Sequence, residues 1–337
     1  MPLMAATPSR TPDHDMVEEF KPMLDALFTP EVKIGLAVSG GPDSLALLLL
    51  AAAARPGKVE AATVDHGLRP ESAAEAAMVA KLCAELGVPH QILTVKWAKK
   101  PKTGIPERAR TERYALLRDW ATERGLGGLA TAHHLDDQVE TFLMRLNRGS
   151  GVRGLGAMRR TGPSPAGGVP IARPMLGMRR WQLEALCLDS GVMPVDDPSN
   201  DDPQFARSRM RAALEEAKWL DPVAISLSAS IIAEADVALT WTTKQVWQRS
   251  VKVEGQRIQF NPDGIPREIR RRVLNRVLNT LGHESADEPL RAREVNELLL
   301  ALANGRKSTL RGVLCIGGDN WLFKPAPPRV ATAPAAR

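Results

Sequence analysis

The stretch VKIGLAVSGGPDSLALLLLAAAA, residues 32–54, decides how this chain folds. Residues 32–39 are mostly apolar and have the length of a buried strand. Residues 45–54 are too apolar to face water on any side, which predicts a buried helix. A strand that passes through a glycine turn into a buried helix begins a parallel strand–helix–strand unit. The polar turn between the two consists of Ser39, Gly40, Gly41, Pro42, Asp43 and Ser44.

Strands and helices continue to alternate beyond this unit. Ser72, with Glu75 three residues later, is predicted to cap the next helix, which stops at Gly87. We therefore expect an α/β fold, a doubly wound parallel sheet covered by helices on both faces. The further predicted strands are 59–65, 90–95 and 128–132, and the further predicted helices are 107–124, 136–148 and 179–190.

Four segments are expected along the chain. Residues 1–30 form an N-terminal extension that is only partly ordered, and residues 31–217 form the α/β domain. Residues 218–326 form a smaller, mainly helical domain, and residues 327–337 a flexible tail. The boundary between the two domains is predicted at residues 216–222.

The composition indicates a soluble protein and is compatible with a polyanionic partner. The 337 residues carry 45 Lys and Arg against 39 Asp and Glu, which gives a net charge of +6. Clustered arginines favour phosphate binding, although many basic proteins bind nothing anionic. The longest apolar run, residues 45–54, is far shorter than the roughly 20 residues of a membrane span. We expect a cytoplasmic protein without a membrane partner.

The three cysteines are scattered along the chain. Cys83, Cys187 and Cys315 form no C-x-x-C pair. The sequence therefore predicts neither a disulfide framework nor a zinc or iron–sulfur site, and buried free thiols are expected.

The polar turn at residues 39–44 has the composition of a phosphate site. It follows the first strand at the carboxyl edge of the sheet, where parallel sheets bind ligands. Its glycines let backbone N–H groups approach an anion, while the helix N-terminus and the serine hydroxyls add further attraction. Asp43 is out of place in a pure anion site, so we expect it to hold Mg²⁺ or to orient the loop. The alternative is a plain Gly-Gly turn capped by Ser44.

The turn also lacks the lysine of a Walker-type loop, which argues against γ-phosphate hydrolysis. It resembles instead the S-G-G-x-D-S loop of the PP-loop ATP pyrophosphatases, which is complete here. This resemblance implies an adenine-nucleotide alpha hydrolase-like fold, ATP as a substrate, and adenylation of an oxygen with release of pyrophosphate. The loop alone does not choose among the members of this group.

A second polar segment, TAHHLDDQVET at residues 131–141, follows the fourth predicted strand at the same edge. Asp137 and Glu140 are three residues apart and Asp136 and Glu140 four apart, so one helix face presents carboxylates. Such a face can hold Mg²⁺ or an ammonium group. Alternatively, the aspartates only complement the helix N-terminus. The two histidines before them are candidates for a general base or for nucleotide contacts.

These residues, together with others, make the chain similar to the tRNA(Ile)-lysidine synthetase family. The resemblance runs in the same order from residue 32 to about residue 215 and is loose beyond residue 220. Besides the loop, the similar segments are VDHGLR at 64–69, Ala109-Arg110 to Arg113-Tyr114, AHHLDDQVET at 132–141, RGSG at 148–151 with Gly154, Leu155 and Met158, RPML at 173–176, DPSN at 197–200 and FARSRMR at 205–211.

Two departures from the family pattern concern the region after the α/β domain. Ser208 occupies a position where the family usually has Asn, and the usual His and Pro are missing after the arginine run, at residues 211–216. These departures affect the expected domain junction and not the chemistry. The chain is also too short for the additional C-terminal domain of longer members.

The resemblance implies a specific reaction. The family joins the ε-amino group of free lysine to C2 of the wobble cytidine in tRNA(Ile) with a CAU anticodon. ATP first adenylates the C2 oxygen, with Mg²⁺ neutralising the phosphates, and lysine then displaces AMP. The C-terminal domain is expected to bind the tRNA.

The resemblance also implies roles for individual residues. Asp43 serves Mg²⁺ and phosphate positioning, while Asp137 and Glu140 bind lysine or metal. His133 assists the cytidine step. Asp65 and His66 touch the nucleotide, or else have a core or capping role. Arg113 and Arg207 contact phosphates, and Asp136, Arg209 and Arg211 are further substrate contacts.

Two other functions explain part of the sequence. Cytidine thiolation of tRNA uses a similar loop, but it requires cysteines that bind a cluster and carry sulfur. A non-catalytic adenine-nucleotide-binding module would explain the loop but not the acidic helix or the arginines at 207–211. The sequence leaves the oligomeric state and the order of substrate binding open.

Overall fold

The computed structural model describes residues 10–68, 71–97, 103–195, 202, 204–282 and 290–327. The chain divides into two units, Met1–Ile231 and Ile232–Arg337. The division falls inside the long helix α9, Pro222–Ser250, shortly after the boundary predicted at residues 216–222. Arg69, the DPSN segment and most of the predicted tail lie outside the described residues.

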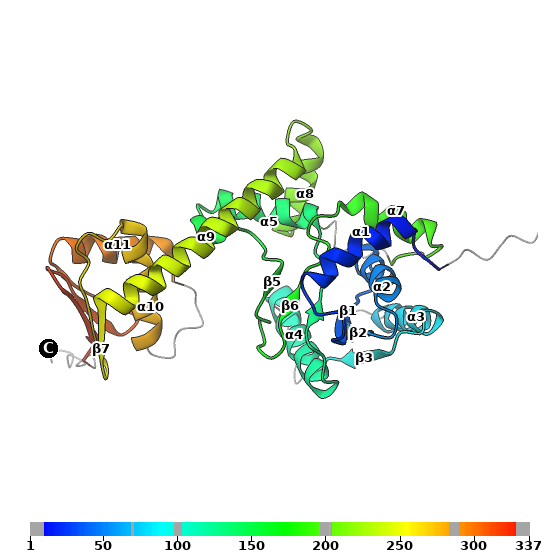
Figure 1. Ribbon diagram of the computed structural model, residues 1–337, viewed down its shortest axis with the longest axis horizontal. Helices are drawn as coiled ribbons and strands as arrows, with labels where there is room; N and C mark the ends of the chain where they lie inside the picture. The colour runs from blue at the N-terminus through cyan, green and yellow to red at the C-terminus, as the bar shows by residue number, and fades with distance from the viewer. Residues whose placement is uncertain are drawn as a thin grey trace, which may run out of the picture. The chain divides into compact units, whose positions relative to one another are not determined.

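A six-stranded sheet is the framework of the first unit (Figure 1). Its order is β3-β2-β1-β4-β6-β5, and only the pairing of β5 with β6 is antiparallel. The predicted doubly wound parallel sheet is confirmed. Strands β4 to β6 have two residues each, too few for an alternating pattern, and β5 and β6 were not predicted. The strands are β1 Ile34–Ala37, β2 Val59–Asp65, β3 His90–Thr94, β4 Leu129–Ala130, β5 Thr161–Gly162 and β6 Ile171–Ala172.

Helices cover both faces of this sheet, as Figure 1 shows. Successive strand residues point to opposite faces. Ala61 and Ala130 pack with helices α1, α2, α3 and α7, whereas Ala62 and Leu129 pack with α4. The loop helix α2 and helix α4 therefore lie on opposite faces. The helices are α1 His14–Asp25, α2 Pro42–Ala54, α3 Ser72–Glu85, α4 Ile105–Glu123, α5 Leu135–Asn147, α6 Val152–Leu155, α7 Arg180–Asp189 and α8 Ala206–Glu216.

Gly35 on β1 allows α4 to approach the sheet closely. A Cβ atom at this position would lie 2.7 Å from the Trp120 ring and 2.9 Å from side-chain atoms of Leu126 and Leu129. Trp120 is buried in the core of the α4 face, so it has little room to move away. A larger residue at position 35 would therefore displace α4.

Helix α1 forms where the sequence predicts only partial order. Its Phe20 and Leu24 are fully buried against the face that α2 covers. Arg55, which follows α2, pairs with Asp25 at the end of α1 at 2.6 Å. Apolar burial and this ion pair together fix the helix to the sheet domain.

The predicted cap of α3 is wrong. Glu71, and not Ser72, occupies the N-cap position, and its side chain makes no capping hydrogen bond within the described ranges. The Ser72 hydroxyl instead donates a hydrogen bond to Oδ1 of Asp65 at 2.7 Å. This bond ties the start of α3 to the end of β2.

The second unit combines helices with a five-stranded antiparallel sheet of order β7-β8-β11-β10-β9. The helices expected in this region are present, and the sheet accompanies them. The β7–β8 hairpin was not predicted, because most of β7 is exposed and carries no apolar pattern. Its remaining elements are β7 Val251–Glu254, β8 Arg257–Phe260, α10 Arg267–Leu281, α11 Ala292–Ala303, β9 Lys307–Leu310, β10 Val313–Ile316 and β11 Trp321–Pro325.

Helix α9 is long and apolar enough to pass for a membrane span by length and composition, contrary to the prediction made from the longest uninterrupted apolar run. One such helix is weak support for a membrane protein, because helices of soluble proteins pass the same test. Asp236 on this helix is 7% exposed and pairs with Arg272 of α10 at 2.6 Å. This buried ion pair connects α9 to α10 within the second unit.

Candidate active site

The phosphate loop is closed by the Ser44 hydroxyl. Its Oγ accepts hydrogen bonds from the backbone N–H groups of Ser39 at 3.1 Å and Gly40 at 3.0 Å, and donates to the Gly41 carbonyl at 2.9 Å. Gly40 has φ of +97°, a value that disfavours any side chain. Gly41 and Pro42 then start α2. Ser44, predicted to contact phosphate, is 5% exposed and braces the loop from within.

His134 connects the phosphate loop to the acidic helix α5. Its Nε2 lies 3.5 Å from carboxylate oxygens of both Asp43 and Asp137, and its Nδ1 lies 3.7 Å from Asp136. The side chain also caps α5, since Nδ1 accepts from the Asp137 N–H at 3.4 Å. Burial lowers the pKa of His134, but the hydrogen bond with Asp43 and the surrounding carboxylates outweigh burial and raise it overall. From the sequence, His134 is a candidate general base or nucleotide contact, and the role in the cytidine step is given to His133 alone.

His133, the predicted catalytic histidine, faces a different set of groups. Its Nδ1 lies 2.8 Å from the Thr131 hydroxyl. Burial lowers the pKa of His133 to about 3, with Asp137 opposing this shift and nearby arginines adding to it. The imidazole is therefore neutral at physiological pH, so it can exchange hydrogen bonds with a nucleoside but does not supply a positive charge.

Glu140 is held by two arginines. It is 2% exposed, and its two oxygens lie 2.8 Å from Arg207 Nε and 3.1 Å from Arg211 Nε. Arg207 also reaches Asp137 at 3.5 Å. These contacts join α5 to α8, so residues predicted to bind lysine and residues predicted to bind phosphate are paired with one another. Arg209 has a different contact, since its Nη1 donates to the Gln204 carbonyl at 2.9 Å.

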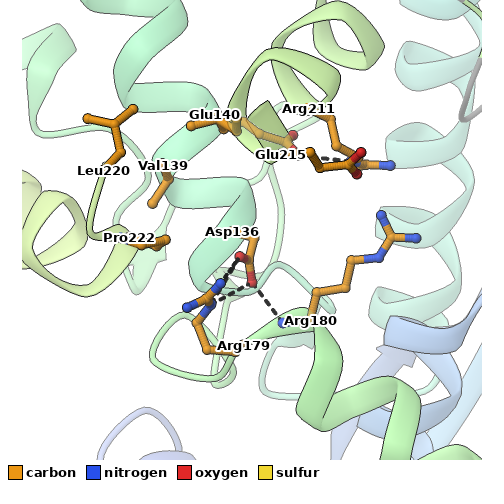
Figure 2. A pocket seen from close by; sticks show the side chains of 10 residues that line it. Asp136, Val139, Glu140, Arg179, Arg180, Arg211, Glu215, Leu220 and Pro222 are labelled. Atoms are coloured by element: carbon orange, nitrogen blue, oxygen red, sulfur yellow. Dashed lines mark hydrogen bonds and ion pairs between the residues drawn. The ribbon is translucent and has the colours of Figure 1, made fainter. Parts of the chain in front are cut away.

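Asp136 belongs to a cavity of about 220 Å³ beside α5 (Figure 2). Its carboxylate accepts hydrogen bonds from Arg179 Nε at 3.0 Å and from the Arg180 N–H at 2.7 Å. Charged groups line one part of the cavity and apolar side chains another, a combination that suits an aliphatic chain with a charged end. The lining residues are Asp136, Val139, Glu140, Arg179, Arg180, Arg211, Leu214, Glu215, Leu220 and Pro222.

Asp65 and His66 lie at the end of β2, at the same sheet edge. Asp65 accepts from the Gly67 N–H at 2.8 Å and from the Ser72 hydroxyl, which is a turn-stabilising role. His66 has a buried Nδ1 without a hydrogen-bond partner among the described residues. Burial, and then the charge of Arg113, lower the pKa of His66. Of the two, His66 is thus the one with an unused polar atom.

The carboxylates at the site are compatible with magnesium bound through a nucleotide. Within the described ranges, no group of three or more His, Cys, Asp or Glu side chains is arranged to hold a metal ion. Asp43 and Asp137 nevertheless approach the same His134 nitrogen, and Asp43 Oδ1 is buried without a hydrogen-bond partner in the described part of the chain. Mg²⁺ in nucleotide sites commonly takes one or two carboxylates together with phosphates and water. The donor set therefore fits such an ion.

The thiols are buried, as the sequence predicts. Cys83, Cys187 and Cys315 are free, and burial raises the pKa of each to about 12. Such thiols stay protonated at physiological pH, whereas sulfur transfer and cluster binding use thiolates.

The fold and the loop define a PP-loop ATP-using enzyme, and residues 12–218 match the PP-loop domain family. A solved structure of a U34-tRNA thiolase from Methanococcus maripaludis, with its [4Fe-4S] cluster, shares this fold: the TM-score is 0.50 at 17% identity, covering 66% of this chain and 80% of that one. Two curated tRNA(Ile)-lysidine synthases are far more similar in sequence. The one from Zymomonas mobilis is 42% identical over 88% of this chain and 89% of its own, and the one from Novosphingobium aromaticivorans is 44% identical over 88% and 90%. The chain belongs to the tRNA(Ile)-lysidine synthase family.

Proposed function

We propose that the protein ligates free lysine to C2 of the wobble cytidine of tRNA(Ile) with a CAU anticodon, in the cytoplasm. The reaction consumes ATP and forms AMP, pyrophosphate and lysidine through an adenylated cytidine. One observation carries this proposal. His134 lies beside Asp43 of the phosphate loop and Asp137 of α5, so the loop and the carboxylates of α5 meet at this side chain. Adenylation and amine attack require these two kinds of site side by side.

In the first step, the cytidine C2 oxygen attacks the α-phosphorus of ATP and pyrophosphate leaves. The N-terminus of α2, which begins at Pro42 after Gly41, stabilises the negative charge that develops on the phosphates. Asp43 and Asp137 would hold Mg²⁺, which neutralises phosphate charge when bound. His133, neutral at physiological pH, would hydrogen-bond the cytidine and hold it beside the loop.

In the second step, the lysine amine attacks C2 and AMP leaves with the oxygen. The cavity beside Asp136 and Glu140 offers apolar walls for the lysine chain and carboxylates for a cationic end. Glu140 accepts an ammonium group only when one of its two arginines releases it. Arg207 has 45% of its side chain exposed and Arg211 has 23%, so Arg207 is the one freer to turn away.

Thiolation receives less support. It requires thiolates, and the three thiols are buried with a pKa of about 12.

The decisive experiment is incubation with labelled lysine, ATP and an unmodified tRNA(Ile) transcript. Label should enter the tRNA with stoichiometric release of AMP and pyrophosphate. A matched transcript with uridine in place of the wobble cytidine should stay unlabelled, since it lacks the reacting base. Failure of the wild-type protein to label the first transcript, with ATP and Mg²⁺ present, would refute the proposal.

A further inference from the structure

A group of arginines on the other face of the sheet is used by none of the steps above. Arg110 and Arg113 of α4 lie over the Tyr114 ring, with guanidinium carbons 4.9 and 5.1 Å from the ring centre. Arg173 follows β6 at the carboxyl edge, and its backbone N–H donates to the Arg160 carbonyl at 2.8 Å. We call Arg110, Arg113, Tyr114 and Arg173 the Tyr114 site.

Among the described residues, the three guanidinium groups of the Tyr114 site have no carboxylate as an ion-pair partner. Within the part of the chain that the structure describes, Arg110, Arg113 and Arg173 form no ion pair. Ile171 of β6 packs in the same core cluster as Tyr114, and Arg173, two residues further along, extends from the same face of the sheet. Burial lowers the pKa of Arg173, and the charge of Arg110 adds to this lowering. Like charges gathered without a counter-charge favour an anionic ligand.

Two buried polar atoms of the site also lack partners. Tyr114 is 1% exposed, and its hydroxyl has no hydrogen-bond partner among the described residues. Nε of Arg173 is buried and likewise unpartnered, while Nη1 is held by the Arg159 carbonyl at 2.9 Å. Buried donors are normally satisfied, so these two are available to a ligand oxygen. A guanidinium and a phenol together are well suited to a phosphate.

The position of the site separates it from the ATP phosphates. Tyr114 belongs to the core between the sheet and α4, whereas the phosphate loop leads into α2 on the opposite face. His133 and His66 end strands β4 and β2 at the edge between the two faces, and the charge of Arg113 lowers the pKa of both. A nucleoside at this edge would thus have the ATP phosphates on one side and the Tyr114 site on the other.

We propose that the Tyr114 site binds a backbone phosphate of the RNA substrate next to the reacting nucleoside. This inference rests on the proposed function. ATP and RNA would then approach the same edge from opposite faces of the sheet. The phosphodiester anchors the strand, while the loop presents the α-phosphorus to the base. This assigns RNA binding to Arg110, Tyr114 and Arg173 in addition to Arg113.

The test compares Arg113→Gln and Arg173→Gln with the control Arg108→Gln. Arg108 lies on the same helix, is exposed and is not stacked on Tyr114. Binding of a tRNA(Ile) transcript without ATP is followed by fluorescence anisotropy at several salt concentrations. Each site variant should raise Kd about 5-fold or more and lower the salt slope by about 1, whereas Arg108→Gln changes neither. Tyr114→Phe should raise Kd without changing the slope, since it removes a donor and no charge.

Separate measurements distinguish the possible failures. Affinity for a non-hydrolysable ATP analogue and the KM for lysine should be unchanged in all four variants. A loss of ATP or lysine affinity with unchanged tRNA binding would overturn the assignment to RNA. If wild-type protein labels tRNA but the site variants bind it like Arg108→Gln, the Tyr114 site is refuted and the ligase function stands. Arg113 makes no hydrogen bond in the described structure, so Arg113→Gln is informative even if Arg173→Gln proves unstable.

Discussion

At the residue scale, the negative charge of Asp43 is expected to position a cation beside the phosphate loop. Oδ1 of this residue is buried and has no hydrogen-bond partner among the residues described, and Oδ2 lies 3.5 Å from His134 Nε2. Asp43→Asn removes one negative charge at nearly constant shape. We expect the rate of tRNA-dependent pyrophosphate release to fall roughly 100-fold, because a cation near the α-phosphate is held less well. Thermal unfolding should be nearly unchanged, and a folded variant with the wild-type rate would contradict this role.

Glu140 separates the lysine requirement from the ATP requirement. In Glu140→Gln a neutral amide replaces the carboxylate, so an ammonium group loses its ionic partner. We expect the KM for lysine to rise about 10-fold or more, with the KM for ATP within about 2-fold of wild type. Adenylated tRNA should accumulate.

The control for Glu140→Gln is Glu85→Gln, because Glu85 pairs with Arg10 at the surface. Lysine, ATP and Mg²⁺ are titrated separately against both variants. A defect that Mg²⁺ corrects and lysine does not would show that Glu140 serves the metal.

The sequence brings the right carboxylates together but does not show what each one contacts. Asp136, Asp137 and Glu140 share a helix face because of their spacing, which is a local property. Glu140 is paired with arginines that lie 67 and 71 positions away in the chain, and only the docking of α8 on α5 brings them there. Which of two adjacent histidines faces Asp43 depends on where α5 begins, since the cap position turns His134 inward.

At the element scale, length decides what the sequence can predict. β2 was predicted at residues 59–65 and has the same bounds in the structure, because its seven residues are enough for a strand pattern to be recognised, and the first five of them are buried. The pairing of β5 with β6 depends on backbone contacts between segments that have no pattern of their own. Helix α1 is ordered by a distant partner, Arg55, which local composition does not reveal.

Helix α10 offers a test of stability against pH. Burial raises the pKa of Glu268. Hydrogen bonds from Arg271 and Arg272 outweigh the effect of burial, so the pKa stays below its ordinary value of 4.5. A carboxylate with a lowered folded-state pKa stabilises the protein fully above pH 4.5, and this contribution is lost as the pH falls through the lowered value. We expect Glu268→Gln to lower the unfolding midpoint at pH 7 and to differ less from wild type at about pH 3.

The matched control on the neighbouring helix is Glu297→Gln. Glu297 pairs with Arg293, but both side chains are exposed, at 62% and 89%. Exposed pairs contribute little to stability, so this variant should follow the wild-type curve from about pH 7 to about pH 3. Thermal unfolding by circular dichroism checks both variants, and a pH-independent difference for Glu268→Gln would contradict the expectation.

At the scale of the whole molecule, the two units differ in what they can bind. The loop, the acidic helix and the cavity all lie within Met1–Ile231, and each suits a small molecule or a single nucleotide. A tRNA carries phosphates along its whole length, so its affinity comes from many separate contacts. The unit Ile232–Arg337 is therefore expected to add phosphate contacts of its own and none to ATP or lysine.

Two lysines of the second unit test this expectation. Lys244 on α9 and Lys252 on β7 are exposed and form no ion pair within the described residues. Replacing both with Gln should weaken tRNA binding about 3- to 10-fold at roughly 0.1 M salt and flatten its salt dependence. The ATP and lysine requirements should stay unchanged. The matched control replaces the exposed lysines Lys58 and Lys81, which lie toward the amino edge of the first sheet, away from the site. If both pairs of substitutions affect tRNA binding equally, the second unit has no special part in holding the RNA, because net charge alone would then explain the loss.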